Sequence, residues 1–225
     1  MTEKIEKETL ATSLNAKLEK SKGAVLAVAI VALVVIIAVA AIATIKAKST
    51  EKGLELFDSI SYTLTDKANE LSSEDLAGRQ SKALEELSSL ASKGGIVGLR
   101  ANMLIAEIKF SQKNYEEARA AWLKAISAKG KNYTTSLCYY NAAVCSEELN
   151  DTEKAISYYK AASDDEDFLL IDHALFSLGR VNEGAEKYTE AKAAYEKLFE
   201  LRGTSNWGQL AKSRLIALKT EGKIE

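Results

Sequence analysis

Residues Ala106 to Gly130 read AEIKFSQKNYEEARAAWLKAISAKG, and the chain repeats their pattern of small and aromatic residues twice more. Ala106 lies in one amphipathic run, and the next run, twelve residues on, contains Ala118-x3-Trp122. The same spacing recurs in two later sets, which are Ala143, Ala155 and Tyr159, and Gly179, Ala191 and Tyr195. The sets step by 37 and then by 36 residues. A fixed period of this length is typical of a solenoid, in which each unit buries its apolar face against its neighbours.

The small residues at these positions predict close helix packing. Where a small residue in one helix faces a small residue in the next, two antiparallel helices can approach closely. The aromatic residue one turn beyond the second alanine then fills the space between this pair of helices and the following pair. Each unit is therefore expected to be a hairpin of two helices.

This spacing resembles the tetratricopeptide repeat (TPR), whose signature is W-x2-L-G-x2-Y followed by A-x3-F. The second half of the signature is matched by Ala118-x3-Trp122, Ala155-x3-Tyr159 and Ala191-x3-Tyr195. The first half is matched by Leu175-x2-Leu178-Gly179-x2-Asn182 and, less closely, by Tyr139-x2-Ala142-Ala143-x2-Ser146, Asn102-x2-Ile105-Ala106-x2-Lys109 and Trp207-x2-Leu210-Ala211-x2-Arg214. Chance matches in an alanine-rich bundle are the alternative, and three pairs with one spacing argue against it. The resemblance implies an all-α solenoid of helical hairpins.

The solenoid is expected to occupy residues 47–225. A stripe that includes Phe57 and Ile60 predicts a helix, Ser72 begins a capping signal for the next helix, and Lys93-Gly94-Gly95 is expected to end it. The predicted units are a degenerate first hairpin at 50–95, repeats at 99–130, 136–167 and 172–203, and a capping helix at 205–220. Gly130 and Gly203 stand where the family usually has proline, which this sequence lacks altogether.

Ahead of the solenoid, residues Gly23 to Ile45 carry no charged side chain. The 22 residues from Ala24 form a helix of about 33 Å, enough for the roughly 30 Å hydrocarbon core of a bilayer. We therefore expect a short basic tail at 1–22 and a transmembrane helix at 23–46. A cleavable signal peptide is the alternative, since Ala38-x-Ala40 and Ala41-x-Ala43 fit a cleavage site, but its apolar region is normally about 7 to 15 residues.

The lysine distribution predicts the orientation of this helix. Five lysines precede the apolar run and three follow it within the next few residues. Because the more basic side faces the cytoplasm, we expect a single-pass inner-membrane protein with a cytoplasmic N-terminus and an extracytoplasmic, periplasmic repeat domain. Leu10, Leu14 and Leu18 share one face of the tail, which is expected to be a solvated lead-in to the span, with a partner-binding helix as the alternative.

The titratable residues argue against catalysis. The formal net charge of −2 gives no basic surface for nucleic acid, and His173 is the only histidine. Cys138 and Cys145 lie about 10.5 Å apart along one helix, whereas a disulfide needs Cα atoms within about 7 Å. We interpret both as packing residues, and a Cys145–His173 pair would lack an orienting acid. The sequence therefore predicts no enzyme, metal site, cofactor or small-molecule substrate.

One acidic run resembles a cation-binding loop only superficially. Asp164-Asp165-Glu166-Asp167 lacks the glycine and the spacing of an EF-hand loop. It is expected to precede a helix that begins near Phe168, where carboxylates favour the helix N-terminus.

The remaining feature is a binding surface. In TPR proteins the first helices of successive units line a concave groove that holds a peptide or a partner helix. Transferred by position, the resemblance implies a partner-binding groove formed by Arg100, Met103, Glu107, Phe110, Leu137, Tyr140, Val144, Glu147, His173, Phe176, Arg180 and Glu183. Tyr140 and Phe176 are expected to lie side by side and exposed, while Tyr159 and Tyr195 fill the core. A mixed lining of this kind suits protein segments.

The order of tail, span and repeats resembles the YfgM-like ancillary subunits of the bacterial Sec translocon. The resemblance implies a membrane-anchored scaffold or adaptor for protein–protein interactions in extracytoplasmic protein export, chaperone recruitment or envelope assembly. A cytoplasm-facing TPR receptor, or a structural subunit of a membrane complex, is the alternative.

Overall fold

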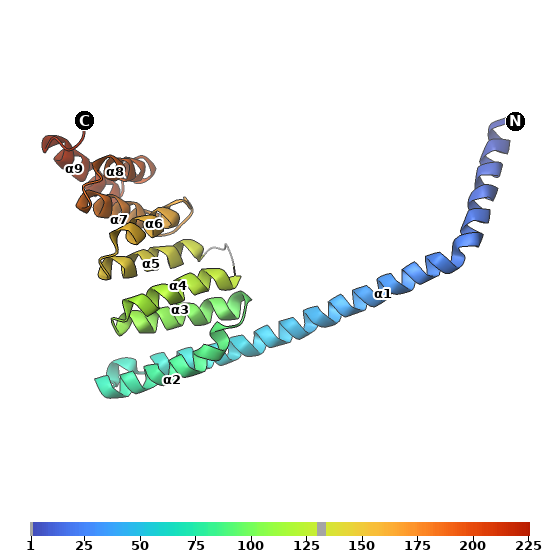
Figure 1. Ribbon diagram of the computed structural model, residues 1–225, viewed down its shortest axis with the longest axis horizontal. Helices are drawn as coiled ribbons and strands as arrows, with labels where there is room; N and C mark the ends of the chain where they lie inside the picture. Colours follow the sequence, from blue (N-terminus) through green and yellow to red (C-terminus); the bar gives the residue numbers. More distant parts are fainter. Residues whose placement is uncertain (1, 130–133) are drawn as a thin grey trace. The chain divides into compact units, whose positions relative to one another are not determined.

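The structure is a computed structural model of the 225-residue chain and describes residues 2–129 and 134–225. Within these ranges every regular element is a helix (Figure 1). The elements are α1 (Thr2–Thr65), a 3₁₀ helix η1 (Ala68–Glu70), α2 (Ser73–Ala91), α3 (Gly95–Ser111), α4 (Tyr115–Lys129), α5 (Thr135–Glu148), α6 (Thr152–Ser163), α7 (Ile171–Gly184), α8 (Tyr188–Arg202) and α9 (Asn206–Thr220). The predicted all-α class is confirmed. Gly130, the predicted end of one repeat, lies outside the described residues.

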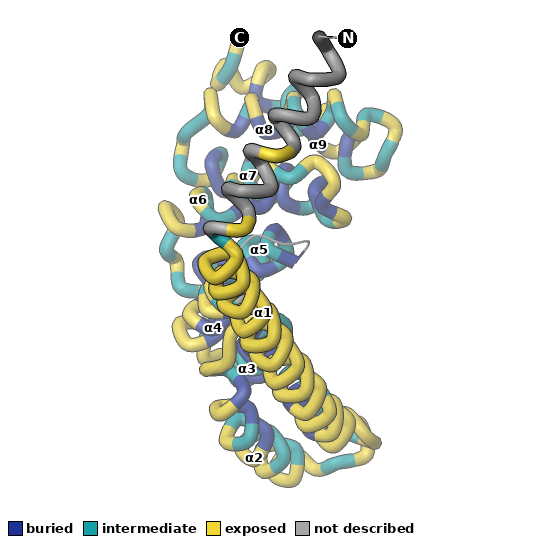
Figure 2. Tube along the Cα trace, turned by 90° about the vertical axis from the view of Figure 1, so that its right-hand side faces the viewer, coloured by how far each residue is buried: buried dark blue, intermediate teal, exposed yellow. Residues whose placement is uncertain are grey.

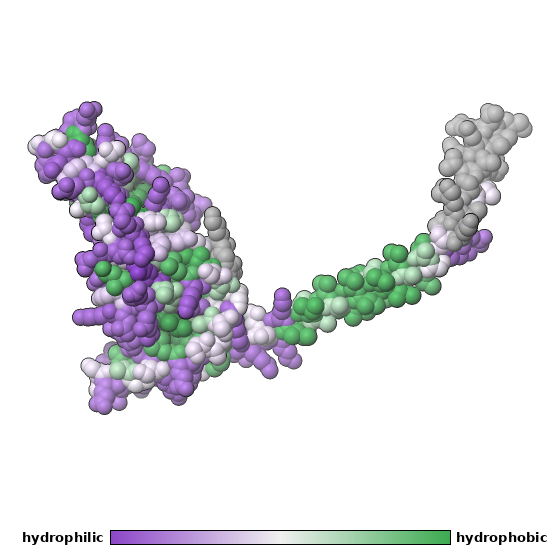
Figure 3. Space-filling model, in the orientation of Figure 1, coloured by the Kyte–Doolittle hydropathy of each residue, from purple (hydrophilic) through white to green (hydrophobic). Residues whose placement is uncertain are grey.

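The chain divides into two units, Met1–Lys52 and Gly53–Glu225. In the first unit, one apolar segment of α1 is long and apolar enough to cross a membrane, and none of that segment is buried in the protein. The large residues of this segment are exposed along its whole length (Figure 2), and the face of the helix seen in Figure 3 is hydrophobic. The side chains of Leu10, Leu14 and Leu18 lie outside the described residues.

The second unit is a stack of helical hairpins. The hairpins α3–α4, α5–α6 and α7–α8 follow one another, each second helix packs on the next first helix, and α9 packs on α8 and α7. At the beginning of the stack, Phe57 and Ile60 from the end of α1 share one core with Leu87 of α2 and Val97 of α3. The last turns of α1 therefore belong to the fold of the second unit.

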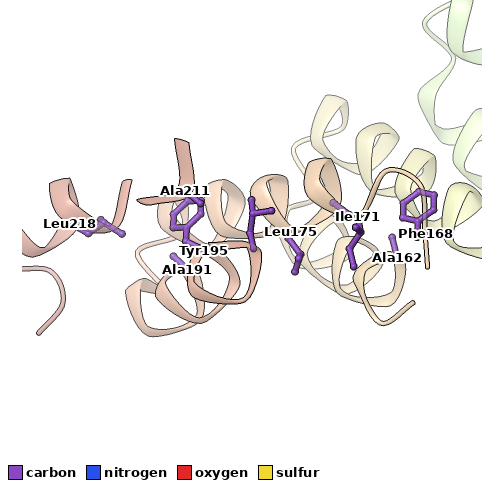
Figure 4. Close-up of a cluster of buried hydrophobic side chains, with 10 residues drawn as sticks. Ala162, Phe168, Ile171, Leu175, Ala191, Tyr195, Ala211 and Leu218 are labelled. Carbon is purple, nitrogen blue, oxygen red and sulfur yellow. The ribbon is translucent and has the colours of Figure 1, made fainter. Parts of the chain in front are cut away.

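The small and aromatic residues of the repeat pattern form the core, as the sequence predicts. The alanines of the pattern are fully buried, and so is Tyr195, while Trp122 and Tyr159 are nearly so. Figure 4 shows Tyr195 beside Ala191 and Ala211, which come from α8 and α9. Because no side chain larger than a methyl group separates the paired helices at these positions, the helices approach closely and the aromatic rings pack into the core between hairpins.

The turn inside each hairpin has the same conformation three times. Lys113, Asn150 and Glu186 have φ values of 62°, 55° and 59°, in the left-handed region. The next residue donates its N–H to the carbonyl five positions earlier, as in the 2.8 Å bond from Asp151 N to Ser146 O. This is the Schellman ending of a helix, usually built on glycine. Here three different non-glycine residues adopt it.

Two helix boundaries differ from the sequence-based expectation. Gly94 does not end α2, which stops at Ala91, but stands at the N-cap of α3. The expected helix start near Phe168 is wrong, since α7 begins at Ile171. The reason is that Phe168 turns into the core in a tight turn, in which its N–H donates to Asp165 O at 3.1 Å. By contrast, Ser72 caps α2 as expected, accepting from Asp75 N at 3.1 Å.

Candidate functional site

The twelve predicted groove residues lie in three sets of four on α3, α5 and α7. Within each set the spacing of three or four residues places the side chains on one helix face. We call the surface formed by these three faces the groove face. Glu107 and Arg180 are exposed, and the other ten are half-buried.

The two aromatic residues of the groove face are not as free as expected. The Tyr140 ring packs edge-on against Tyr159 at 5.6 Å between centroids and lies 6.4 Å from Phe168. The Phe176 ring lies 5.5 Å from Tyr195 and 5.2 Å from Trp207. Each ring therefore covers the core tyrosine of its own hairpin and presents only part of its surface to a partner.

Glu147 connects three helices by hydrogen bonds. Its Oε1 accepts from the Tyr159 hydroxyl of α6 at 2.6 Å and from Arg180 Nη2 of α7 at 2.7 Å. Burial, together with the neighbouring Glu147 carboxylate, raises the pKa of Tyr159, so the hydroxyl keeps its proton and remains a donor. From the sequence we expected Glu147 and Arg180 to recognise a partner. In the structure their hydrogen bonds join adjacent hairpins.

Glu183 repeats this arrangement one unit later. Its Oε2 accepts from the Tyr195 hydroxyl at 3.0 Å, and Arg214 of α9 binds the same carboxylate through Nε and Nη2. Arg214 was not among the predicted site residues. In the TPR signature Arg214 occupies the position of Asn182, whereas the predicted groove residue one repeat earlier is Arg180. Carrying the groove positions from one repeat to the next therefore could not identify Arg214.

A cavity of about 430 Å³ opens beside this second network. Its lining residues, which include three from the predicted set, are Phe176, Arg180, Glu183, Gly184, Tyr195 and Arg214. With a half-buried ring beside two arginines and a carboxylate, the cavity can accept one polar or aromatic side chain of a partner. Gly184 leaves room at its rim, since a Cβ atom there would meet nothing within 4 Å.

On α3, Arg100 of the groove face makes contacts within the protein, whereas Glu107 is exposed. Arg100 pairs with Asp58 at 3.1 Å and lies over the Phe57 ring at 4.3 Å, so it holds the first hairpin. Glu107 is exposed, yet desolvation by the surrounding protein raises its pKa.

The cysteines occupy the core. Cys138 and Cys145 are fully buried and share a cluster with Trp122. Burial raises the pKa of Cys138 to about 12 and that of Cys145 to about 11. The packing interpretation is confirmed by this burial. His173 lies on a different helix, with its ring 4.5 Å from that of Trp207.

Comparison with known proteins identifies the repeats. Tetratricopeptide-repeat families match residues 99–164 and 172–204. A "TPR repeat-containing protein" of Treponema pallidum (strain Nichols) is 33% identical over 139 residues, which are 62% of this chain and 58% of that protein. The chain thus spans less than two thirds of the length of this relative. The crystal structure of MamA protein aligns with 56% of this chain and 66% of its own at 20% identity, with a TM-score of 0.46, a likeness too distant to carry an argument.

The fold and these matches define a class. The chain contains tetratricopeptide repeats, and such repeats indicate a scaffold for protein–protein interactions. Proteins built from them are typically adaptors without enzymatic activity.

Proposed function

We propose that this protein is a membrane-anchored TPR scaffold that holds a protein partner at the inner membrane, with its repeat domain on the extracytoplasmic side. The observation that supports the anchor is the unburied apolar segment of α1. A helix that is apolar all round for six turns is unusual in water, because a soluble helix normally hides one face and hydrates the other. The lysine distribution supports the orientation.

The partner is a polypeptide segment that lies along the groove face. Glu107 and Arg180 offer exposed charges, the cavity beside Gly184 offers a place for one side chain, and Met103 and Val144 supply apolar contacts. Because Glu147 and Glu183 already accept internal hydrogen bonds, they orient the arginines and do not themselves recognise the partner. The chain acts by binding and not by catalysis.

The role that we favour is protein export, chaperone recruitment or envelope assembly. This part of the proposal rests on the resemblance of the order of tail, span and repeats to the YfgM-like subunits of the Sec translocon. A cytoplasm-facing receptor, or a structural subunit of a membrane complex, is the second candidate, and the side of the membrane on which the repeats lie distinguishes it.

The test is site-specific photocrosslinking in intact membranes. A photoreactive amino acid at Glu107 or Gly184 is expected to crosslink a protein partner, whereas the same residue at Glu85, exposed on α2, is not. Crosslinks to a translocon or chaperone component support the export role, and crosslinks to an outer-envelope factor support assembly. Crosslinks to a cytoplasmic protein favour the receptor. Equal crosslinking from all three positions, or crosslinking from Glu85 alone, contradicts the groove assignment.

A further inference from the structure

One charged side chain of the groove face has no partner within the described part of the protein. This side chain is Glu107, which is exposed on α3. We propose that Glu107 binds a basic side chain of the partner segment, and that an apolar residue next to this base packs on Met103 and Val144. The inference rests on the proposed function, because it names the kind of segment that the groove face accepts.

The charges of the groove face are balanced within the protein except at Glu107. Five of the twelve groove residues carry a full charge near neutral pH, and four of these are paired. The pairs are Arg100 with Asp58 at 3.1 Å, Arg180 with Glu147 at 2.7 Å, and Glu183 with Arg214. Lys109, the nearest cation along the chain, is itself paired with Glu117 at 2.7 Å. Within residues 2–129 and 134–225, Glu107 has neither an ion pair nor a hydrogen bond, so one negative charge remains unmatched.

Glu107 differs from an ordinary surface carboxylate in its hydration. An unpaired carboxylate is unremarkable where water surrounds it. Protein atoms displace part of that water at Glu107, since desolvation raises its pKa, and no neighbouring charge contributes to the shift. Because water screens a partly dehydrated charge less, an arriving cation is attracted more strongly than at a fully hydrated site. Both carboxylate oxygens also lack a donor within the described chain, so they can accept hydrogen bonds from an ammonium or guanidinium group.

The residues around Glu107 favour a base with an apolar neighbour. Met103 and Phe110 lie four residues before and three residues after Glu107, which places them on the same face of α3. Both are half-buried and pack against a core cluster that contains residues of α5. Val144 occupies on α5 the position that Glu107 has one unit earlier.

A segment that crosses from α3 to α5 therefore meets the carboxylate and then an aliphatic surface. The apolar stem of a lysine or arginine can lie on this surface while its charged end reaches Glu107. An acidic or uncharged apolar segment would remove more water from Glu107 without supplying a donor, which is unfavourable for a charged group. The groove face therefore selects a base at this position.

The test selects peptides on the full-length protein in detergent. The probe is a phage-displayed library of random peptides of about twelve residues, which span roughly 40 Å when extended and can cross three helices. Peptides that bind the unmodified protein but not Val144→Trp are counted as groove binders, because the indole fills the groove face without changing its charge. Circular dichroism checks that each variant is folded.

We expect lysine or arginine next to an apolar residue to be enriched among the groove binders, and not among peptides selected on Glu107→Gln. For a synthetic groove binder, replacing its base with glutamine should weaken binding to the unmodified protein about threefold to tenfold. The same replacement should change binding to Glu107→Gln by less than about twofold. The matched control Glu85→Gln, at an exposed position on α2, should behave as the unmodified protein does.

The outcomes separate this inference from the proposed function. Groove binders without an enriched base, or a base whose replacement weakens binding equally on Glu107→Gln, overturn the role of Glu107 and leave the groove face as a binding surface. A library that yields no groove binder overturns the proposed function and the inference together. The comparison with Glu107→Gln needs no groove-filling variant, so it stands even if Val144→Trp does not fold.

Discussion

At the scale of single residues, the hairpin turns combine a strained backbone with unsuitable side chains. An L-residue in the left-handed region carries a cost of about 1–2 kcal/mol, which asparagine bears better than lysine or glutamate. Of the three turn positions only Asn150 has the favourable residue. The turns at Lys113 and Glu186 are therefore less stable than they would be with a more suitable residue.

Replacing Glu186 with asparagine is expected to stabilise the protein by about 0.5–1 kcal/mol. Glu186 is exposed and has φ of 59°, so the change relieves the backbone without removing a core contact. The measurement is the midpoint of urea unfolding. Asn150→Ala serves as the converse variant and should lower the midpoint. A lower midpoint for Glu186→Asn would show that the turn conformation is wrong.

Gly179 illustrates a site where packing outweighs helix propensity. A Cβ atom there would lie 2.4 Å from Tyr195 Cε1, and that ring is fully buried and held by Glu183. Alanine gains about 1 kcal/mol in a helix over glycine, but overpacking a core costs about 1–3 kcal/mol. We expect Gly179→Ala to lose up to about 2 kcal/mol of unfolding free energy, measured by thermal or urea unfolding. Gly184→Ala is the control, because nothing lies within 4 Å, and it should be neutral or stabilising.

The two thiols should react slowly because they are buried. With the pKa of Cys138 raised to about 12, its thiolate fraction near pH 8 is roughly a thousandfold below that of an ordinary cysteine of pKa about 8.5. A maleimide is therefore expected to label the native protein slowly and the denatured protein rapidly, as mass spectrometry would show. Equally fast labelling in both states would mean that this core opens readily or is not packed as described.

At the scale of helices, Glu147 should contribute more to stability than its partial exposure suggests. Removing it leaves the Tyr159 hydroxyl without its acceptor and breaks the bond to Arg180. We expect Glu147→Ala to cost about 1–2 kcal/mol, with faster amide hydrogen exchange concentrated in α5, α6 and α7. Lys82→Ala is the control, since it breaks an exposed pair at 3.9 Å and should cost about 0.5 kcal/mol or less. Equal losses of stability in Glu147→Ala and Lys82→Ala would show that the hydrogen bonds of Glu147 contribute no more than an exposed ion pair.

The helices and their pairing could be predicted from sequence because a local spacing encodes them. Ala118 and Trp122 lie one turn apart on the same helix, so their burial follows from the period alone. The groove face was harder, since its chemistry depends on which side chains meet across hairpins. The bond from Arg214 to Glu183 joins positions that the repeat does not relate, and Tyr140 is covered by Phe168, from an irregular connection. No periodic signal specifies such contacts.

At the scale of the whole molecule, the two units have opposite relations to water. The repeats bury most of their apolar residues in core clusters, whereas none of the apolar segment of α1 is buried. In water the exposed apolar surface of α1 is unfavourable, and no other part of the described chain covers it. In a bilayer each Leu, Ile or Val near the centre contributes about −0.3 to −0.6 kcal/mol to insertion, while a lysine there costs about 2.5–3.5 kcal/mol. The segment as a whole is therefore expected to favour insertion by several kcal/mol.

This balance predicts how the protein fractionates. The full-length chain should remain in the membrane pellet after alkaline carbonate washing, and a shortened chain that begins at Ser49 should be soluble and strongly helical by circular dichroism. Because two lysines at the centre of the segment cancel most of the insertion energy, Leu33→Lys with Ile36→Lys should move a substantial part of the protein to the supernatant. Leu56→Lys, at an exposed position within the repeat unit, should not. Release of the unmodified chain by carbonate would refute the anchor and leave the repeat domain as a soluble scaffold.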